Sequence, residues 1–328
     1  MLPNSHFITI NDNRTLVSRF LEELIITPKH LLKEWAVITK QTPAAKIGYI
    51  GQHLASLLTG VKGTGTGARG DDLADGSEVK SCNKIDQVDK CKECGARVLR
   101  MENVCSSCGS TKIQRKDDSK WLFSVRSEHE LNQYLEMDRI VLILMDYPRF
   151  KQKDYSDIRI CAFEIYPREK RSEVFRTLIS NHYFNIYRKK ADAGKKTNPM
   201  NLHPWKIQFY KCNPIKTFEC IIKDVDGNAE LEIKKYVEPN VERNAQMETE
   251  PMPTSLLNPD EWKILSEGKN FKRIKPFLKD KKLNRQEFAK LTKKGKEKVL
   301  PYLNEELRNL IPLRDIVSTT QSTQYHRT

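Results

Sequence analysis

Four cysteines stand in two C-x-x-C-G motifs, and ten residues separate the second cysteine of one motif from the first of the other. Four thiolates at this spacing suit a tetrahedral zinc ion. The glycine after each motif permits a tight turn whose backbone N–H groups can point at sulfur. A redox C-x-x-C motif would instead open a helix. We therefore predict a structural zinc site formed by Cys91, Cys94, Cys105 and Cys108.

A second group of chemically capable residues lies just upstream of the first cysteine motif. Glu78 and Lys80 would share one face of a strand, because side chains alternate with a period of two. An Asp-Gly turn at Asp75 and Gly76 would bring Asp71 opposite Lys80 if the turn has two residues. Two carboxylates can hold Mg²⁺ through oxygen, and the ammonium group can stabilise developing negative charge. The alternative is an exposed polar hairpin with an incidental salt bridge.

The elements that must position these residues follow from the pattern of apolar side chains. Apolar residues recur at helical spacing before a glycine-rich stretch and predict a helix over 47–58. A longer helical pattern at 14–35, broken by Pro28, predicts a helical hairpin. Apolar and β-branched runs predict strands at 77–81, 121–125, 139–145, 158–165, 205–210 and 217–222, with a helix at 127–135. This mixture predicts an α/β fold.

The composition limits the partners of the chain. Its 328 residues include 57 Lys or Arg and 43 Asp or Glu, which gives a formal net charge of +14. This charge favours a polyanion, either nucleic acid or an anionic membrane. The longest apolar runs are far shorter than the ~20 residues of a membrane-spanning helix. No basic segment followed by a long apolar stretch begins the chain. We therefore expect a cytoplasmic protein with reduced thiols and no membrane partner.

Much of the excess positive charge lies in residues 269–298, which hold thirteen Lys or Arg against three acidic residues. Apolar residues are interleaved with the charges, so we expect one helical segment that contacts DNA phosphates. Its candidate contacts are Lys293, Lys294 and Lys296. The alternative is an ordinary solvated helix face. The Pro- and Glu-rich stretch at 238–259 favours a linker before this segment.

The order of these features resembles a known nuclease superfamily. A helical stretch at 46–54 followed by D-x(6)-E-x-K at 71–80 is similar to the MutH-type branch of the PD-(D/E)XK nucleases. More closely, residues 31–253 resemble the MamI-like type II restriction endonucleases. The residues that carry this resemblance are the cysteine motifs directly after Glu78-Val79-Lys80, G-D-D-L at 70–73, S-K-W-L-F-S-V at 119–125 and N-L-H-P at 201–204.

The resemblance implies a fold, a domain organisation and an activity. The fold would be a PD-(D/E)XK core with a mixed sheet flanked by helices and an inserted zinc ribbon. The domains would be an N-terminal helical region at 1–43, a nuclease domain at 44–250 with the ribbon at 86–116, and a basic helical DNA-binding region at 251–328. The activity would be Mg²⁺-dependent cleavage of double-stranded DNA at an interrupted palindrome of the GAT-N4-ATC kind. A palindromic site in turn favours a homodimer.

The comparison with the MutH-type pattern leaves two assignments open. That pattern has a further Glu on the helix, but the matching residue here is Ala55, so Gln52 or His53 could replace it. His53 has an alternative role, because a lone His on an amphipathic helix is more often a core residue. The catalytic, metal-binding Asp is Asp71 in an ungapped match, and Asp72 when the apolar residue after it is matched. Both remain candidates.

Base recognition should lie outside the catalytic residues. Arg and Lys pair with guanine edges, and Asn and Gln pair with adenine. The candidates are Lys92, Arg97, Arg100, Lys120, Arg126 and the segment 188–206. An alternative function is a non-catalytic zinc-ribbon DNA-binding or transcription factor, which gives the acidic motif no role. An RNA-binding or tRNA-processing protein fits the charge but is not favoured by the E-x-K motif.

Overall fold

The computed structural model describes residues 3–11, 14–39, 41, 47–65, 71–100, 102–243 and 247–314. Its centre is a five-stranded mixed sheet in the order β1-β6-β7-β9-β10. The first pair, β1 and β6, is parallel, and each remaining pair is antiparallel. The strands are β1 (Glu78–Asn83), β6 (Ile140–Asp146), β7 (Ile158–Ile165), β9 (Ile215–Lys223) and β10 (Glu230–Tyr236). The expectation of a mixed α/β fold is confirmed.

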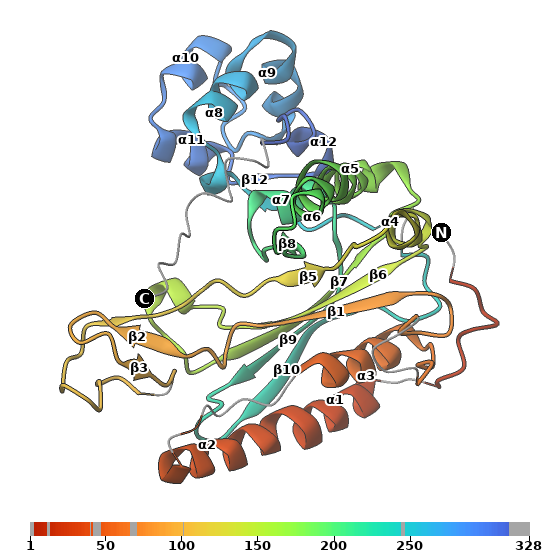
Figure 1. Ribbon diagram of the computed structural model, residues 1–328. Coiled ribbons are helices and arrows are strands. Elements are labelled where there is room, and N and C mark those ends of the chain that lie inside the picture. Colours follow the sequence, from red (N-terminus) through yellow and green to blue (C-terminus); the bar gives the residue numbers. More distant parts are fainter. Residues whose placement is uncertain are drawn as a thin grey trace.

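Helices cover both faces of this sheet (Figure 1). On one face lie α1 (Arg14–Leu21), α2 (Thr27–Thr39) and α3 (Ile47–Thr59). On the other lie α4 (Glu128–Glu136), α5 (Glu173–Asn181), α6 (Arg188–Asp192) and α7 (Ile207–Lys211). Every residue of β6 is therefore buried, and its side chains enter two apolar clusters alternately: Leu142 joins one and Ile143 the other.

The N-terminal segment forms one continuous helical rod, so the predicted helical hairpin is wrong. A π-helical turn, η1 (Glu22–Ile26), joins α1 directly to α2. The Thr27 N–H donates to the Glu22 carbonyl, and both ends of the turn keep right-handed helical angles. Pro28 has no N–H to donate, and the wider turn before it accommodates that loss without breaking the helix.

Most of the predicted elements around the sheet are confirmed. The α3 helix forms as expected, and α4 is capped by Ser127, whose hydroxyl accepts from the Glu130 N–H at 3.1 Å. The strand β5 (Trp121–Phe123) also forms, but it pairs with β8 (Met200–Leu202) outside the central sheet.

The predicted strand at 205–210 is wrong. Trp205 has a φ of 60°, which ends any extended conformation, and α7 follows it. The antiparallel partner of β9 on that side is instead β10, which sequence reasoning missed. Its E-L-E-I-K-K-Y sequence carries too many charges to resemble a buried strand.

A small ribbon follows β1 directly and protrudes from one end of the sheet (Figure 1). It consists of β2 (Asp89–Cys91), β3 (Arg97–Val98) and β4 (Ile113–Gln114), with β2 in the middle. The buried Asp89 carboxylate holds its base together, because it accepts from Arg115 Nη1 and from the Lys116 N–H, both at 2.8 Å. Arg100 Nη2 lies 3.2 Å from the same carboxylate.

The basic C-terminal region is a set of short helices, so the prediction of one helical segment is wrong. The elements are η5 (Thr254–Leu256), α8 (Pro259–Ser266), α9 (Gly268–Ile274), η6 (Lys275–Phe277), α10 (Arg285–Lys290), α11 (Lys293–Val299) and α12 (Glu305–Arg308). Capping side chains divide the charged run. Asn284 starts α10 with a capping box, and the Thr292 hydroxyl caps α11.

This C-terminal region packs firmly on the sheet layer. Met252 in the expected linker is fully buried, and β11 (Met252–Pro253) pairs with β12 (Tyr302–Leu303). Lys211 Nζ donates to the carbonyls of Arg308 at 2.9 Å and Ile311 at 2.6 Å. The helices therefore share one apolar cluster with the sheet layer. No helix among the described residues has the length and apolar character needed to span a membrane.

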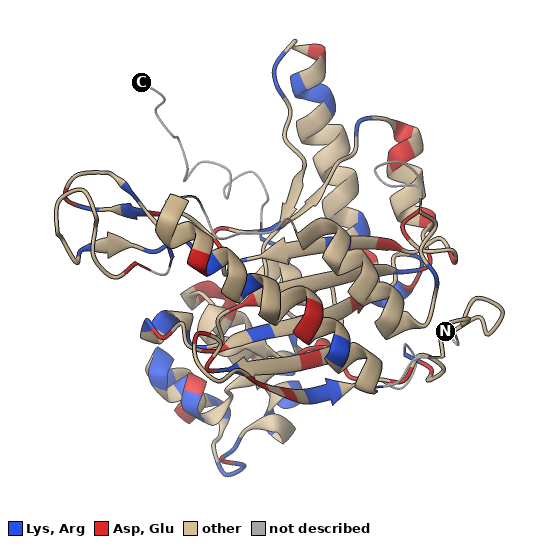
Figure 2. Ribbon diagram, turned by 90° about the horizontal axis from the view of Figure 1, so that it is seen from below, with Lys and Arg blue, Asp and Glu red and all other residues tan. Residues whose placement is uncertain are grey.

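The remaining short helical elements connect these layers. They are η2 (Phe150–Gln152), η3 (Lys170–Ser172) and the π-helical η4 (His182–Tyr187). On the α1–α3 side, Lys and Arg are interspersed with Asp and Glu and do not form a single stripe (Figure 2).

Candidate active site and metal centre

The acidic motif meets helix α3 at the start of β1. The Asp72 carboxylate accepts from the Val79 N–H at 2.7 Å and from Gln52 Nε2 at 2.5 Å. Gln52 lies on α3, and Val79 is the second residue of β1. These two hydrogen bonds fix Asp72 beside Glu78, so the fold brings three of the predicted site residues together.

The loop before β1 differs from the predicted two-residue hairpin. Leu73 forms a bridge with Gly63, and its N–H donates to the Ser77 carbonyl at 3.1 Å. Gly76 closes the turn with a φ of 79°. Asp71 is therefore not paired opposite Lys80: it is exposed, and its carbonyl accepts from the Thr64 hydroxyl at 2.5 Å. Gly70 lies outside the described residues.

The expected pairing of Glu78 and Lys80 is present on β1. Their side chains form an ion pair, and only 16% and 23% of the two side chains are exposed. Tyr134 of α4 is buried near this pair, and its interaction with Lys80 raises the pKa of the lysine. Sequence reasoning missed Tyr134, because a tyrosine on an amphipathic helix carries no signal beyond packing.

Burial and charge make the protonation of Asp72 unusual. Burial raises the pKa of Asp72 to about 6; the Val79 N–H and Lys80 oppose this rise, and the negative charges of Glu78 and Asp71 add to it. Burial lowers the pKa of Lys80, but Tyr134 and Glu78 more than offset that effect, so the pKa is raised overall. The site therefore holds a protonated lysine beside carboxylates that repel each other.

A groove of about 410 Å³ opens beside this cluster, between α3 and the loop at 63–65. The α3 residues in its wall follow helical spacing, and the whole lining is Tyr49, Gln52, His53, Ser56, Gly63, Thr64, Gly65 and Asp72. His53 is exposed at the groove, so its alternative role as a core residue is wrong. Ala55 is fully buried under the sheet, which leaves Gln52 as the α3 residue that contacts Asp72.

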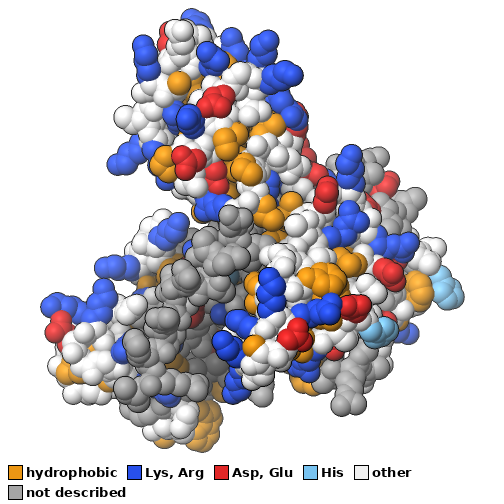
Figure 3. All heavy atoms as spheres, turned by 45° about the horizontal axis from the view of Figure 1, so that its top comes forward, with side chains coloured by type: hydrophobic (Ala, Val, Ile, Leu, Met, Phe, Trp, Pro, Cys, Tyr) orange, Lys and Arg blue, Asp and Glu red, His pale blue; other side chains and the backbone are white. Residues whose placement is uncertain are grey.

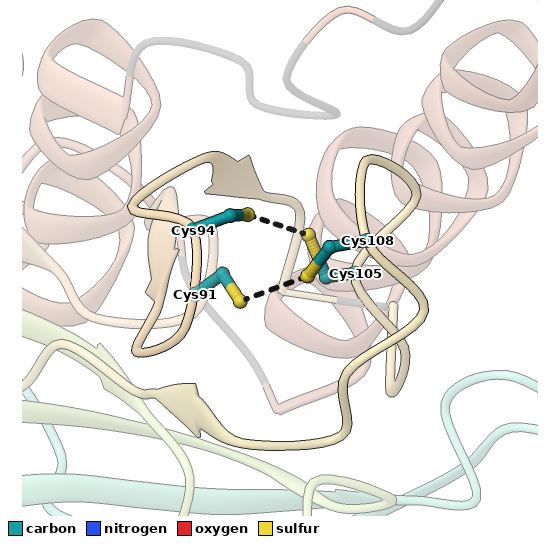
Figure 4. A group of neighbouring side chains, drawn as sticks. All are labelled: Cys91, Cys94, Cys105 and Cys108. Carbon is teal, nitrogen blue, oxygen red and sulfur yellow. Dashed lines mark hydrogen bonds between the residues drawn. The ribbon is translucent and has the colours of Figure 1, made fainter.

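The four cysteines of the ribbon converge at its tip (Figure 4). Their sulfur atoms all lie within 4.8 Å of one another. The Sγ atoms of Cys91 and Cys108 are 3.6 Å apart, as are those of Cys94 and Cys105. Gly95 and Gly109 have φ of 74° and 72°, the conformation that lets each turn close. The predicted grouping of the four thiols is therefore present.

Backbone groups favour thiolates at this tip. The N–H groups of Cys94 and Glu93 lower the pKa of Cys91 to about 6, against a smaller effect of burial. Those of Ser107 and Cys108 likewise lower the pKa of Cys105. At Cys108 the Ser110 N–H lowers the pKa, but hydrogen bonds with the other cysteines and burial outweigh it and raise the pKa to about 12. Four thiols that lie this close fit a tetrahedral zinc ion.

The predicted DNA contacts differ in their accessibility. Lys92, Arg97 and Arg126 are exposed, and Lys120 is half-buried. Arg100 is buried instead, ion-paired with Asp89 and stacked over the Phe150 ring at 5.1 Å. The prediction that Arg100 reads bases is wrong, because its guanidinium anchors the ribbon to the sheet layer.

The three candidate lysines of α11 also differ. Lys293 and Lys294 are both exposed, and Lys293 also donates to the Ser255 carbonyl at 3.3 Å. Lys296 is half-buried, with its ammonium 5.8 Å from the centre of the Phe288 ring. Basic side chains nevertheless spread over the lobe that the C-terminal helices form (Figure 3).

Comparison with known proteins identifies the class to which this fold and site belong. Residues 34–255 match the family described as MamI restriction endonuclease, and this match covers more than half of the chain. The protein is therefore a member of the MamI restriction endonuclease family.

A particular relative is the type II restriction enzyme MamI of Microbacterium ammoniaphilum, which is 48% identical over 60 residues. Those residues are 18% of this chain and 20% of MamI, so the aligned part spans about a fifth of that relative. No solved structure matches the chain.

Proposed function

We propose that the protein is a type II restriction endonuclease that makes Mg²⁺-dependent double-strand cuts in DNA at an interrupted palindrome of the GAT-N4-ATC kind. The observation that carries this proposal is the meeting of Asp72, Glu78 and Lys80 at the start of β1. Family membership adds the reaction class. The fold is then a PD-(D/E)XK core, with Asp72 in preference to Asp71 as the acidic residue before the E-x-K motif.

The donor set of the site fits a hard divalent cation. Asp72 and Glu78 offer carboxylate oxygens, which Mg²⁺ prefers, and their mutual repulsion would be relieved by a cation. When bound, Mg²⁺ would polarise the phosphodiester and lower the pKa of a water molecule.

The residues of the chain supply the rest of the chemistry. Gln52 and the Val79 N–H hold the Asp72 carboxylate in one orientation. Lys80 presents a positive charge next to the reacting phosphate, where it would stabilise the transition state. Phosphodiester hydrolysis places extra negative charge on the phosphate oxygens in the transition state. The positive charge of Lys80 would lie beside that developing negative charge.

The other parts of the molecule take supporting roles in this proposal. A structural zinc ion held by Cys91, Cys94, Cys105 and Cys108 stabilises the ribbon after β1. Lys120, Arg126, Lys293, Lys294 and Lys296 contact double-stranded DNA. The divisions at 1–43, 44–250 and 251–328 separate helical, nuclease and DNA-binding parts. The enzyme acts in the cytoplasm as a homodimer, in keeping with a palindromic site.

A plasmid assay tests the proposal directly. The purified protein is incubated with plasmid DNA and Mg²⁺, and in parallel with EDTA. Discrete fragments that require Mg²⁺ are expected, and their ends can be sequenced to find the site. Binding to DNA without any cleavage, across a range of plasmid sequences, would favour the non-catalytic zinc-ribbon DNA-binding protein instead.

A further inference from the structure

Arg139 stands directly before β6 and contacts three residues of the segment that leads into β1. Its Nε donates to the Ser77 hydroxyl at 3.0 Å, and its Nη2 forms an ion pair with the Asp75 carboxylate. Its carbonyl accepts from the Glu78 N–H at 3.2 Å. Only 8% of Arg139 is exposed. This one residue therefore fixes the loop at 72–77 to the start of β6.

The same loop sets the position of Asp72. Leu73, the next residue, is fully buried. Its N–H donates to the Ser77 carbonyl at 3.1 Å, and its carbonyl accepts from the Gly76 N–H at 3.0 Å. A movement of Ser77 would therefore move Leu73 and, with it, the Asp72 carboxylate.

A second buried arginine holds the helix that contacts Asp72 from the other side. Arg243 Nη2 donates to the Leu58 carbonyl, in the last turn of α3, at 2.7 Å. The same helix carries Gln52, which donates to the Asp72 carboxylate. The Arg243 side chain is fully buried and forms an ion pair with Glu164 of β7.

Glu164 connects the two arginines electrostatically. Burial raises the pKa of Glu164, but the positive charges of Arg243 and Arg139 outweigh that effect and lower the pKa overall. Asp75, Arg139, Glu164 and Arg243 thus form a neutral set of two carboxylates and two guanidinium groups. Buried charges are tolerated only when they are paired in this way. Both partners of the hydrogen bond between Gln52 and Asp72 are therefore tied to one buried carboxylate.

We propose that Arg139 is a positioning residue of the active site, which acts through Asp75 and Ser77 to keep the Asp72 carboxylate beside Glu78. This inference rests on the proposed function, in which Asp72 and Glu78 hold Mg²⁺. Two carboxylates that repel each other would separate if the backbone between them were free to move. Because the loop is braced by Arg139, a cation meets a preformed pair of carboxylates.

Asp75→Asn tests this brace with little risk to folding. The Asp75 side chain is 19% exposed, whereas Arg139→Ala would leave the buried Glu164 with one arginine. An asparagine keeps the oxygen that accepts from the Ser77 N–H at 3.1 Å, so the turn can still form. It removes one of the two negative charges around Arg139, whose guanidinium should then turn toward Glu164 and release the loop.

Hydrogen exchange measures the brace without any assay of cleavage. In Asp75→Asn the amides of residues 72–80 should exchange at least about tenfold faster, because a charge-assisted hydrogen bond is lost. The amides of β7 and β9 should exchange as in wild type. The matched control is Glu305→Gln, which weakens a similarly exposed ion pair with Arg171 and should leave residues 72–80 unchanged. Unchanged exchange at 72–80 in Asp75→Asn would overturn the proposal, as would equal acceleration throughout the sheet.

A Mg²⁺ titration of the cleavage rate tests the positioning role itself. The Mg²⁺ concentration for half-maximal rate should rise about tenfold in Asp75→Asn, because the carboxylates are no longer held together in advance. The rate at saturating Mg²⁺ should stay close to that of wild type, and Asp75→Glu should restore part of the Mg²⁺ affinity. A lower saturating rate with an unchanged Mg²⁺ requirement would overturn the proposal. Wild-type protein that never cleaves, while Asp75→Asn loosens residues 72–80, would refute the proposed function and leave the brace standing.

Discussion

The sheet carries two Glu-x-Lys pairs at its opposite edges. Glu78 and Lys80 form an ion pair on β1, and Glu232 and Lys234 form one on β10. The side chains of the β10 pair are 37% and 47% exposed, about twice the values of the β1 pair. Only the β1 pair has an additional carboxylate, Asp72, held beside it by hydrogen bonds.

This difference shows how little the motif says without its surroundings. Lys234 and Lys223 lower the pKa of Glu232, which therefore remains an ordinary surface carboxylate. On β1, burial and neighbouring acids instead raise the pKa of Asp72 to about 6. The same spacing thus gives a salt bridge at one edge and a candidate cation site at the other.

The largest difference between the two Glu-x-Lys pairs should appear when their residues are replaced one at a time by alanine. Glu78→Ala or Lys80→Ala should reduce the cleavage rate by at least about a hundredfold, as loss of transition-state stabilisation does. Binding to DNA in Ca²⁺ should survive in both variants. Glu232→Ala and Lys234→Ala are the matched controls and should cut like wild type. A β1 variant that cuts at the wild-type rate would place the active site elsewhere.

The cysteine ribbon sharpens the comparison, because it follows β1 and has no counterpart among the described residues after β10. Cys94→Ala or Cys105→Ala leaves an incomplete tetrahedron, and the binding free energy of zinc is also folding free energy. We expect metal analysis to find one zinc per wild-type chain and none in these variants. Their ribbons should become sensitive to proteases.

The control for the zinc test is Ser106→Ala, which changes an exposed residue between two of the cysteines. It should keep its zinc and its protease resistance. Wild-type protein that contains no metal, yet is folded and active, would contradict the assignment.

The pH dependence of cleavage should reflect only the β1 edge. Asp72 must lose its proton to bind a cation, so at limiting Mg²⁺ the rate should fall about tenfold per pH unit below pH 6. More Mg²⁺ should move the midpoint to lower pH, because the cation competes with the proton. Glu232→Ala should leave this profile unchanged. A rate that stays constant well below pH 6 would show that Asp72 is not the titrating group.

The smallest effect is expected from the lysines of α11, which lie far from both Glu-x-Lys pairs. Reversing the charge of Lys293, Lys294 and Lys296 should weaken binding to all DNA sequences and leave the preferred site unchanged. Each phosphate contact contributes a slope of about 0.9 to the dependence of log affinity on log salt. Lys293 and Lys296 already have partners within the chain. The slope of log affinity against log salt should therefore fall by less than the loss of three full phosphate contacts would cause. A loss of discrimination between site and random DNA would mean that this segment reads bases.

Sequence patterns predicted the elements whose periodicity is strong. The apolar spacing of α3 fits a helix alone, and the β-branched runs of β6 and β7 fit buried strands alone. Two errors came from local backbone chemistry. At Pro28, which has no N–H to donate, a π-helical turn keeps the helix continuous. At Trp205 a positive φ ends the extended conformation, and the helix α7 follows in place of the expected strand. Neither conformation leaves a periodic signal.

The candidate site was predictable in its residue types but not in its pairing. The spacing of Glu78 and Lys80 on a strand suffices to place them on one face. Which of Asp71 and Asp72 lies beside Glu78 depends on the β-bridge between Leu73 and Gly63. That bridge belongs to a loop, whose conformation has no periodic signal in the sequence. Arg100 was misassigned because its charge indicates DNA, whereas its burial with Asp89 is a tertiary property.

The buried Lys211 has a consequence for how the chain reaches its native state. Its ammonium caps carbonyls about a hundred residues further along, and Leu303, Leu307 and Ile311 complete the same apolar cluster as the sheet. During synthesis, the apolar surface around Trp121 therefore stays uncovered until those C-terminal residues leave the ribosome. Contacts of such long range fold slowly and expose the nascent chain to aggregation and chaperones.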